Sequence, residues 1–239
     1  MAPEPATAPK ASPRIDTALA VVSAAIIAYG VLVLRWPVFI VMALFWFENV
    51  VIGSFNVLRM LVSGLRMGPA GLVGACAMSA FFTLHYGLFT AVHGVFVVML
   101  FGMPELGREA MNGGLAGPLQ QMLGRLITDR DGWLAMLAIV AAQLVAFVRW
   151  SIETRELPTP LKDLMGAPYG RIVVLHITLI AGGFLVMSLH APVLGALLLV
   201  ALKLGYDLIS LKREPRMQAE HAAQVKARRL LVIGRRNLR

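Results

Sequence analysis

The chain has 239 residues, of which 58% are hydrophobic and only 15% are charged. Soluble domains carry about 25% charged residues, so this composition excludes an ordinary soluble domain and predicts an integral membrane protein. The net charge of +9 could suit nucleic acid, but Lys and Arg in a membrane protein first determine topology. No basic patch with interleaved aromatic residues indicates RNA or DNA as a partner.

The chain divides into a tail, an apolar body and a second tail. Residues 1–16 are rich in Pro and Ala, which predicts a disordered amino-terminal tail. Residues 17–211 are expected to form one all-α transmembrane bundle, because long apolar runs recur along them. Six membrane-spanning helices are predicted over these runs: Thr17–Leu34, Pro37–Ser63, Leu72–Gly102, Trp133–Ile152, Arg171–His190 and Pro192–Leu211. Residues 212–239 are polar and strongly basic.

Two of the connections are longer than tight turns. Within residues 104–132, Pro118, Met122 and Leu126 recur at helical spacing, which predicts a short amphipathic helix lying on the membrane surface. Residues 153–170 contain several prolines and cannot continue a helix. We therefore expect a loop outside the membrane between the fourth and fifth spans.

The basic residues determine the expected orientation. Six spans place both termini on one side, and that side carries 17 Lys and Arg residues against four on the other. Cytoplasmic loops carry the excess of Lys and Arg, so both termini are predicted to be cytoplasmic. We expect the basic carboxyl-terminal tail to contact anionic lipid headgroups of the bilayer.

Ionisable groups inside the predicted spans are the candidate functional residues. A charged side chain at the bilayer centre costs about 2.5–3.5 kcal/mol or more, so it faces protein or water. Counting from the helix ends predicts two polar layers. The central layer contains Glu48, Asn49 and His85, with Gln143 as a further candidate and His93 nearer the outer face, and the layer toward the cytoplasm contains Asn56, Arg59, His176, Lys203 and Asp207.

Each of these groups has a structural and a functional interpretation. Glu48 is expected to pair with His85, either as a clamp between two helices, as a proton relay or substrate contact, or as a metal ligand. Asn49 and Asn56 suit hydrogen bonds between helices as well as ligand binding. Lys203 and Asp207 stand four residues apart and can neutralise each other. The candidate site therefore comprises Glu48, Asn49, Asn56, His85, His93, His176 and Asp207.

No motif fixes a metal or a cofactor. The sequence lacks HExxH and any Cys pair, because Cys76 is the single cysteine, and we expect that thiol to be a small buried packing residue. His85 and His93 are eight residues apart, about 12 Å along a regular helix, so they would not bind one small ion together. Glu48, His85 and His176 are weak candidates for a zinc or iron site. No cofactor is required by the sequence.

Four stretches resemble a family of bacterial polytopic membrane proteins of unknown function. They are WFENVVIGSFNVLRM, HYGLFTAVHG, GRIVVLHITLIAGG and LKLGYDL. The resemblance implies a membrane bundle in the bacterial inner membrane, and it implies no catalytic residue. The chain is also loosely similar to membrane metal-dependent hydrolases, seven-helix proteins that hold zinc with three His, an Asp and a Ser. His85, His93, His176 and Asp207 supply such residue types, but the helix number and residue order differ.

Three functions follow as hypotheses. The first is a membrane protein whose polar core binds or translocates a small polar solute or a proton. The second is an intramembrane metal-dependent hydrolase acting on lipid. The third is an accessory subunit of a larger membrane complex, with a membrane protein or a second copy of the chain as its partner.

Overall fold

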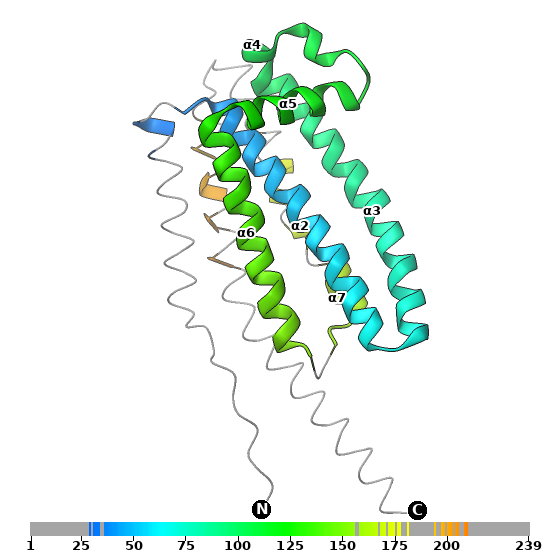
Figure 1. Cartoon of the computed structure of the whole chain (residues 1–239). Coiled ribbons are helices and arrows are strands. Elements are labelled where there is room, and N and C mark those ends of the chain that lie inside the picture. The colour runs from blue at the N-terminus through cyan, green and yellow to red at the C-terminus, as the bar shows by residue number, and fades with distance from the viewer. Residues whose placement is uncertain are drawn as a thin grey trace, which may run out of the picture.

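The computed structural model describes residues 29, 31–33, 36–155, 158–166, 168–170, 172–174, 176–177, 181, 194, 197–198, 200–202, 204–205 and 208–209. Within these residues every regular element is helical, as the apolar runs predicted. Figure 1 shows α2, α3 and α6 as long, roughly aligned rods, with α5 lying across one end and α7 beside α2 near the other. The tails 1–16 and 212–239, Lys203 and Asp207 lie outside the described residues.

The first long pair of helices is α2, Val38–Arg66, and α3, Pro69–Val97. Both predicted helices are confirmed, each starting or ending within a few residues of its expected limit. The turn between them depends on Gly68, whose φ of 89° suits glycine, and Pro69 then starts α3 with a preset φ. The turn is short, so α2 and α3 return side by side.

Small residues allow α2 and α3 to approach closely at the end near this turn. A Cβ added at Gly64 would collide with the Cβ of Ala75 and lie 2.7 Å from the carbonyl oxygen of Gly71. Farther along, a Cβ at Gly53 would lie 2.6 Å from the ring of Tyr86. Helices in membranes associate through such close backbone contacts because lipid removes most of the hydrophobic drive.

At its carboxyl-terminal end, α3 continues into a π-helical turn and a further short α-helix. A π-helical turn, Val98–Gly102, leads into α4, Met103–Leu106, so the continuous helical stretch has 38 residues. At 1.5 Å per residue it is about 57 Å long and exceeds a hydrocarbon core of about 30 Å. The sequence predicted this excess length, and the structure accommodates part of it as a projection that carries α4 beyond the bundle (Figure 1).

The amphipathic helix of the 104–132 connection is present as α5, Ala116–Thr128, after a 3-10 turn at Arg108–Met111. Pro118, Met122 and Leu126 form its buried face, at the predicted spacing. The expectation that this face rests on lipid is wrong. Met122 and Leu126 are fully buried in a protein core with Phe39 and Val97, because the projecting end of the bundle offers apolar surface to cover.

The third long helix is α6, Arg130–Glu153. It begins at Asp129, whose Oδ1 accepts a hydrogen bond from the Gly132 amide at 2.9 Å and caps the helix. Most of its apolar side chains are exposed, among them Leu137, Val145 and Ile152. α6 therefore lies at the edge of the described bundle, and its outer face is the kind of surface that lipid covers.

The connection after α6 is not the simple surface loop that the prolines predicted. It contains a short helix, α7, Leu161–Gly166, which packs on α2 and α3 through Leu164, buried with Met60, Phe82 and Tyr86. The hydroxyl of Ser63 donates to the Thr159 carbonyl at 2.6 Å, and Nδ2 of Asn56 donates to the Leu164 carbonyl at 2.8 Å. The described residues 158–166 and 168–170, which we call the re-entrant segment, thus fold back along the bundle.

The re-entrant segment reaches the middle of α3. The ring of Tyr169 lies 6.1 Å from that of Tyr86 and 6.0 Å from that of His85. Tyr86 is seventeen residues beyond Pro69, so the ring of Tyr169 lies beside a level of α3 that is about 25 Å from the start of this helix. Irregular backbone at membrane depth is tolerated where protein satisfies its polar groups, and Ser63 and Asn56 do so here.

Three described helices are long and apolar enough to cross a membrane: Val38–Arg66, Pro69–Leu106 and Arg130–Glu153. They match the second, third and fourth predicted spans. The first span falls almost wholly outside the described residues, and only scattered residues of the fifth and sixth are described.

Candidate functional site

Two histidines from segments far apart in the sequence meet in the bundle. Nε2 of His93 on α3 lies 2.9 Å from Nδ1 of His176. On its other side, Nδ1 of His93 lies 2.7 Å from the carbonyl oxygen of Phe89, one turn earlier on α3. His93 is 2% exposed and His176 is exposed. We call these two residues the histidine pair.

The Phe89 carbonyl determines where the protons of the histidine pair lie. A carbonyl oxygen only accepts, so Nδ1 of His93 carries a hydrogen, and Nε2 of the neutral ring is then an acceptor. The donor to this acceptor is Nδ1–H of His176, which lies 2.9 Å from Nε2 of His93. This tautomer assignment leaves Nε2 of His176 as the free basic nitrogen, on the more exposed of the two rings.

Aromatic packing holds the histidine pair in place. The Phe89 ring lies 4.6 Å from the His93 ring and 6.0 Å from the His176 ring. The two imidazoles are 5.1 Å apart at an interplanar angle of 62°, so they meet edge to face. This geometry directs one ring nitrogen at the other and excludes parallel stacking, which supports the hydrogen bond.

The two-layer assignment is wrong for the histidine pair. Counting from the helix ends placed His93 toward the outer face and His176 toward the cytoplasm, whereas the hydrogen bond places them at one level. The reason is the re-entrant segment. Counting assumed that the fifth span starts at the membrane surface near Arg171, but Tyr169 already lies beside the middle of α3, so His176 is displaced along the bundle axis.

His85 has different neighbours. It is exposed on α3 and stacks on Phe81, with ring centroids 5.6 Å apart and nearly parallel rings. Its ring also contacts Tyr169 of the re-entrant segment. Glu48 is half-buried on α2, and its pairing with His85 stays a prediction.

The asparagines of α2 have separate structural roles. Asn56 is 1% exposed and binds the re-entrant segment, as described above. Nδ2 of Asn49 donates within its own helix to the Phe45 carbonyl at 2.8 Å, while its buried Oδ1 has no hydrogen-bond partner among the described residues. The expected bond between helices is therefore formed by Asn56, and Asn49 brings an unpaired acceptor into the core.

Sequence reasoning missed a reciprocal contact between α2 and α3. Nε1 of Trp46 donates to the Thr90 carbonyl at 2.7 Å, and the Tyr86 hydroxyl donates to the Asn49 carbonyl at 3.2 Å. Each helix thus supplies one ring donor to the main chain of the other. Tyr86 could have been noticed, since it adjoins His85 and a buried tyrosine needs a hydrogen-bond partner, but nothing in the sequence indicates which carbonyl accepts.

The proposed metal ligands are not gathered by the described part of the chain. Among its His, Cys, Asp and Glu residues, no group of three or more is placed to hold a metal ion, so Glu48, His85 and His176 do not form such a group. Cys76, expected to be buried, is exposed. It occupies the outer face of α3 rather than the core.

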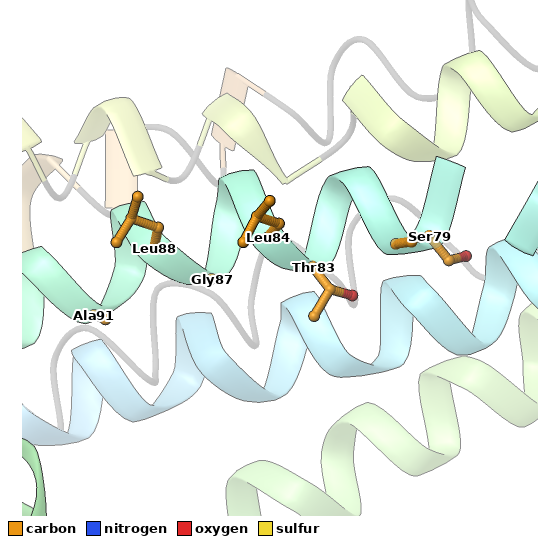
Figure 2. A pocket seen from close by; sticks show the side chains of 7 residues that line it. Ser79, Thr83, Leu84, Gly87, Leu88 and Ala91 are labelled. Atoms are coloured by element: carbon orange, nitrogen blue, oxygen red, sulfur yellow. The ribbon is translucent and has the colours of Figure 1, made fainter. Parts of the chain in front are cut away.

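Figure 2 shows a hollow on that outer face, with Thr83, Leu84 and Leu88 around Gly87. All seven lining residues belong to α3. A Cβ at Gly87 would meet no atom within 4 Å. The hollow is therefore an open helix surface, and no second described element encloses it as a ligand site would require.

The fold and the site define a class: a helical protein whose described part contains three helices of membrane-spanning length and a histidine pair. The chain belongs to DUF6498, a family of unknown function, whose match covers residues 6–224. This confirms the resemblance to an uncharacterised family. No curated protein matches the chain, and no solved structure matches it.

Proposed function

We propose that the protein is an integral membrane protein in which the histidine pair binds a proton and serves the movement of protons or of a small polar solute. The observation that carries this proposal is the 2.9 Å hydrogen bond between a buried His93 and an exposed His176. Ionisable residues within membrane-spanning segments commonly mark ion pathways and proton relays.

The tautomers suit a site for one added proton. When Nε2 of His176 takes up a proton, the hydrogen on its Nδ1 can pass to Nε2 of His93. The charge is then shared across one hydrogen bond instead of residing on an isolated buried cation. A second proton would place two like charges side by side, which is unfavourable. The Phe89 carbonyl occupies Nδ1 of His93, so a proton enters and leaves the pair through Nε2 of His176.

Three further candidate residues, Glu48, Asn49 and Asp207, are proposed as the surroundings of this site. Glu48 and the unpaired Oδ1 of Asn49 supply acceptors on α2, and Asp207 would add a carboxylate from the sixth span. An orientation with both termini in the cytoplasm of a bacterial cell, six spans and a lipid-facing basic tail rests on the charge count of the sequence. The metal-dependent hydrolase is less well supported, since three of its ligands do not converge.

Histidine-labelled protein tests the proton site directly. The chain has five histidines, few enough for ¹⁵N NMR in lipid to resolve the rings as the pH is lowered. We expect the His93 and His176 signals to change together over one titration, and His176→Gln to abolish the change at His93. His85→Gln is the matched control on the same helix and should leave both signals unchanged. Independent titration of the two rings would refute a shared proton.

Proteoliposomes test the movement of protons separately. With a pH-sensitive dye inside and an imposed pH gradient, the wild-type protein should dissipate the gradient faster than empty vesicles. His93→Gln, which keeps size and polarity but cannot be protonated near neutral pH, should remove that difference, and His85→Gln should keep it. Equal flux in wild type and His93→Gln would refute the role in proton movement while leaving the NMR result intact.

A further inference from the structure

Two arginines of α2 converge on one tryptophan of α6, at the end of the bundle near the α2–α3 turn. The guanidinium of Arg59 lies 6.0 Å from the centroid of the Trp150 ring, and that of Arg66 lies 5.9 Å from it. The two arginines are seven residues apart, so they share one face of α2. We call Arg59, Arg66 and Trp150 the arginine–tryptophan cluster.

The two guanidinium groups differ in their hydrogen bonds. Arg66 donates to the Ser151 carbonyl at 2.9 Å, to the Ser151 hydroxyl at 2.8 Å and to the Thr154 hydroxyl at 3.1 Å. Nε of Arg59 is buried and has no hydrogen-bond partner in the part of the chain that the structure describes. Arg66 is thus fixed by α6, while Arg59 retains donor capacity inside the cluster.

Within the described residues, no carboxylate lies at ion-pair distance from either arginine. The nearest ion pair in sequence joins Arg149 and Glu153 at 3.8 Å on α6 itself. Trp150 stabilises the cations through its ring face, worth about 0.5–2 kcal/mol, but does not neutralise them. The cluster therefore presents two positive charges and at least one buried donor without an acceptor.

The surface beside the cluster is apolar. Leu58 and Leu65, each adjacent in sequence to one of the arginines, are 45% and 64% exposed. Such side chains suit acyl chains, and tryptophan favours the level of lipid headgroups. A guanidinium matches phosphate oxygens through paired N–H donors. Basic pockets between membrane helices bind acidic headgroups on the cytoplasmic side.

We propose that the arginine–tryptophan cluster binds the phosphate of an anionic phospholipid. Arg59 supplies the buried Nε donor that has no acceptor among the described residues, Arg66 supplies a fixed second charge, and Leu58 and Leu65 receive the acyl chains. The proposed site uses neither the residues of the basic tail, 212–239, nor those of the histidine pair.

The test uses the full chain in neutral detergent and native mass spectrometry. Phosphatidylglycerol, phosphatidylcholine with the same acyl chains, and inorganic phosphate are titrated in separate experiments. We expect wild type to retain phosphatidylglycerol in preference to phosphatidylcholine. Arg59→Gln should weaken phosphatidylglycerol binding about ten-fold or more, the value for loss of a charge-assisted hydrogen bond. Arg108→Gln, an exposed arginine beyond the other end of α3, is the matched control and should change nothing.

Several results would overturn the proposal. Binding by Arg59→Gln equal to wild type would show that lipid is held elsewhere, for instance by the tail, which is intact in every variant. Equal retention of phosphatidylcholine would remove the charge argument. Inorganic phosphate bound as tightly as phosphatidylglycerol would identify a site for free phosphate. Should Arg59→Gln fail to fold, Arg59→Lys keeps the charge without the paired donors, and binding equal to wild type would refute the role of the guanidinium.

Discussion

Replacing Gly94 by Ala should destabilise the contact between α2 and α3 more than any helix-propensity effect can offset. The added Cβ would collide with the Leu119 side chain and lie 2.7 Å from Nε1 and 2.8 Å from Cε2 of Trp46. The indole is fully engaged there, because its N–H donates to the Thr90 carbonyl at 2.7 Å. The side chain at 94 therefore displaces a buried ring and its hydrogen bond together.

The magnitude follows from three contributions. Forcing extra atoms into a packed interior costs about 1–3 kcal/mol, and a buried donor that loses its acceptor costs about 1–3 kcal/mol. Alanine favours a helix over glycine by about 1 kcal/mol. We expect a net loss of about 1–5 kcal/mol in the free energy of unfolding.

The assay is unfolding of purified protein in mixed micelles, followed by circular dichroism as the fraction of denaturing detergent rises. Gly87→Ala is the matched control, since its Cβ meets nothing within 4 Å on the same helix, and it should be neutral or stabilising by up to about 1 kcal/mol. In a Trp46→Phe background the cost of Gly94→Ala should fall, because the smaller ring leaves room. Equal stability of Gly94→Ala and Gly87→Ala would refute the reasoning.

Two further variants test the connections. Asn56→Ala should loosen the re-entrant segment, because the Leu164 carbonyl loses its donor at a cost of about 1–3 kcal/mol. Hydrogen exchange of amides 161–166 should then accelerate. Ser54→Ala is the control and should not change this exchange, because the Ser54 hydroxyl bonds to the carbonyl of Val50 on the same helix. Asp129→Ala should lower the thermal midpoint more than Glu105→Gln. Asp129 caps α6 and also pairs with Arg125, whereas Glu105 forms a partly exposed ion pair with Arg125 at 3.5 Å. A helix cap contributes about 1 kcal/mol to stability, and an exposed ion pair contributes less. Equal thermal midpoints of the two variants would contradict the capping argument.

The long helices could be predicted because hydrophobic length and helix punctuation act locally. Pro37 and Pro69 lie within one residue of the starts of α2 and α3, and the apolar repeat of α5 identifies its buried face. What covers that face could not be predicted, since an amphipathic stripe looks the same against lipid and against protein. The Phe39 and Val97 core that receives Met122 is assembled from segments far apart in the chain.

The candidate site was predicted in its residue types but not in its pairing. His93 and His176 were both identified, yet depth counting separated them because it treats every connection as lying at the surface. The re-entrant segment breaks that rule, and it gives little local signal. Its hydrogen bonds to α2 come from Ser63 and Asn56, whose acceptors are main-chain carbonyls that any sequence carries.

The re-entrant segment is held by hydrogen bonds to its main chain, and this limits how its sequence can evolve. Since Asn56 and Ser63 recognise carbonyl groups and not side chains, most residue identities between 158 and 170 can drift without releasing the segment. Its length cannot, because one inserted or deleted residue would present a different carbonyl to each donor and rotate Leu164 off its contacts. Among natural relatives, we expect this stretch to vary in composition while tolerating almost no insertions or deletions.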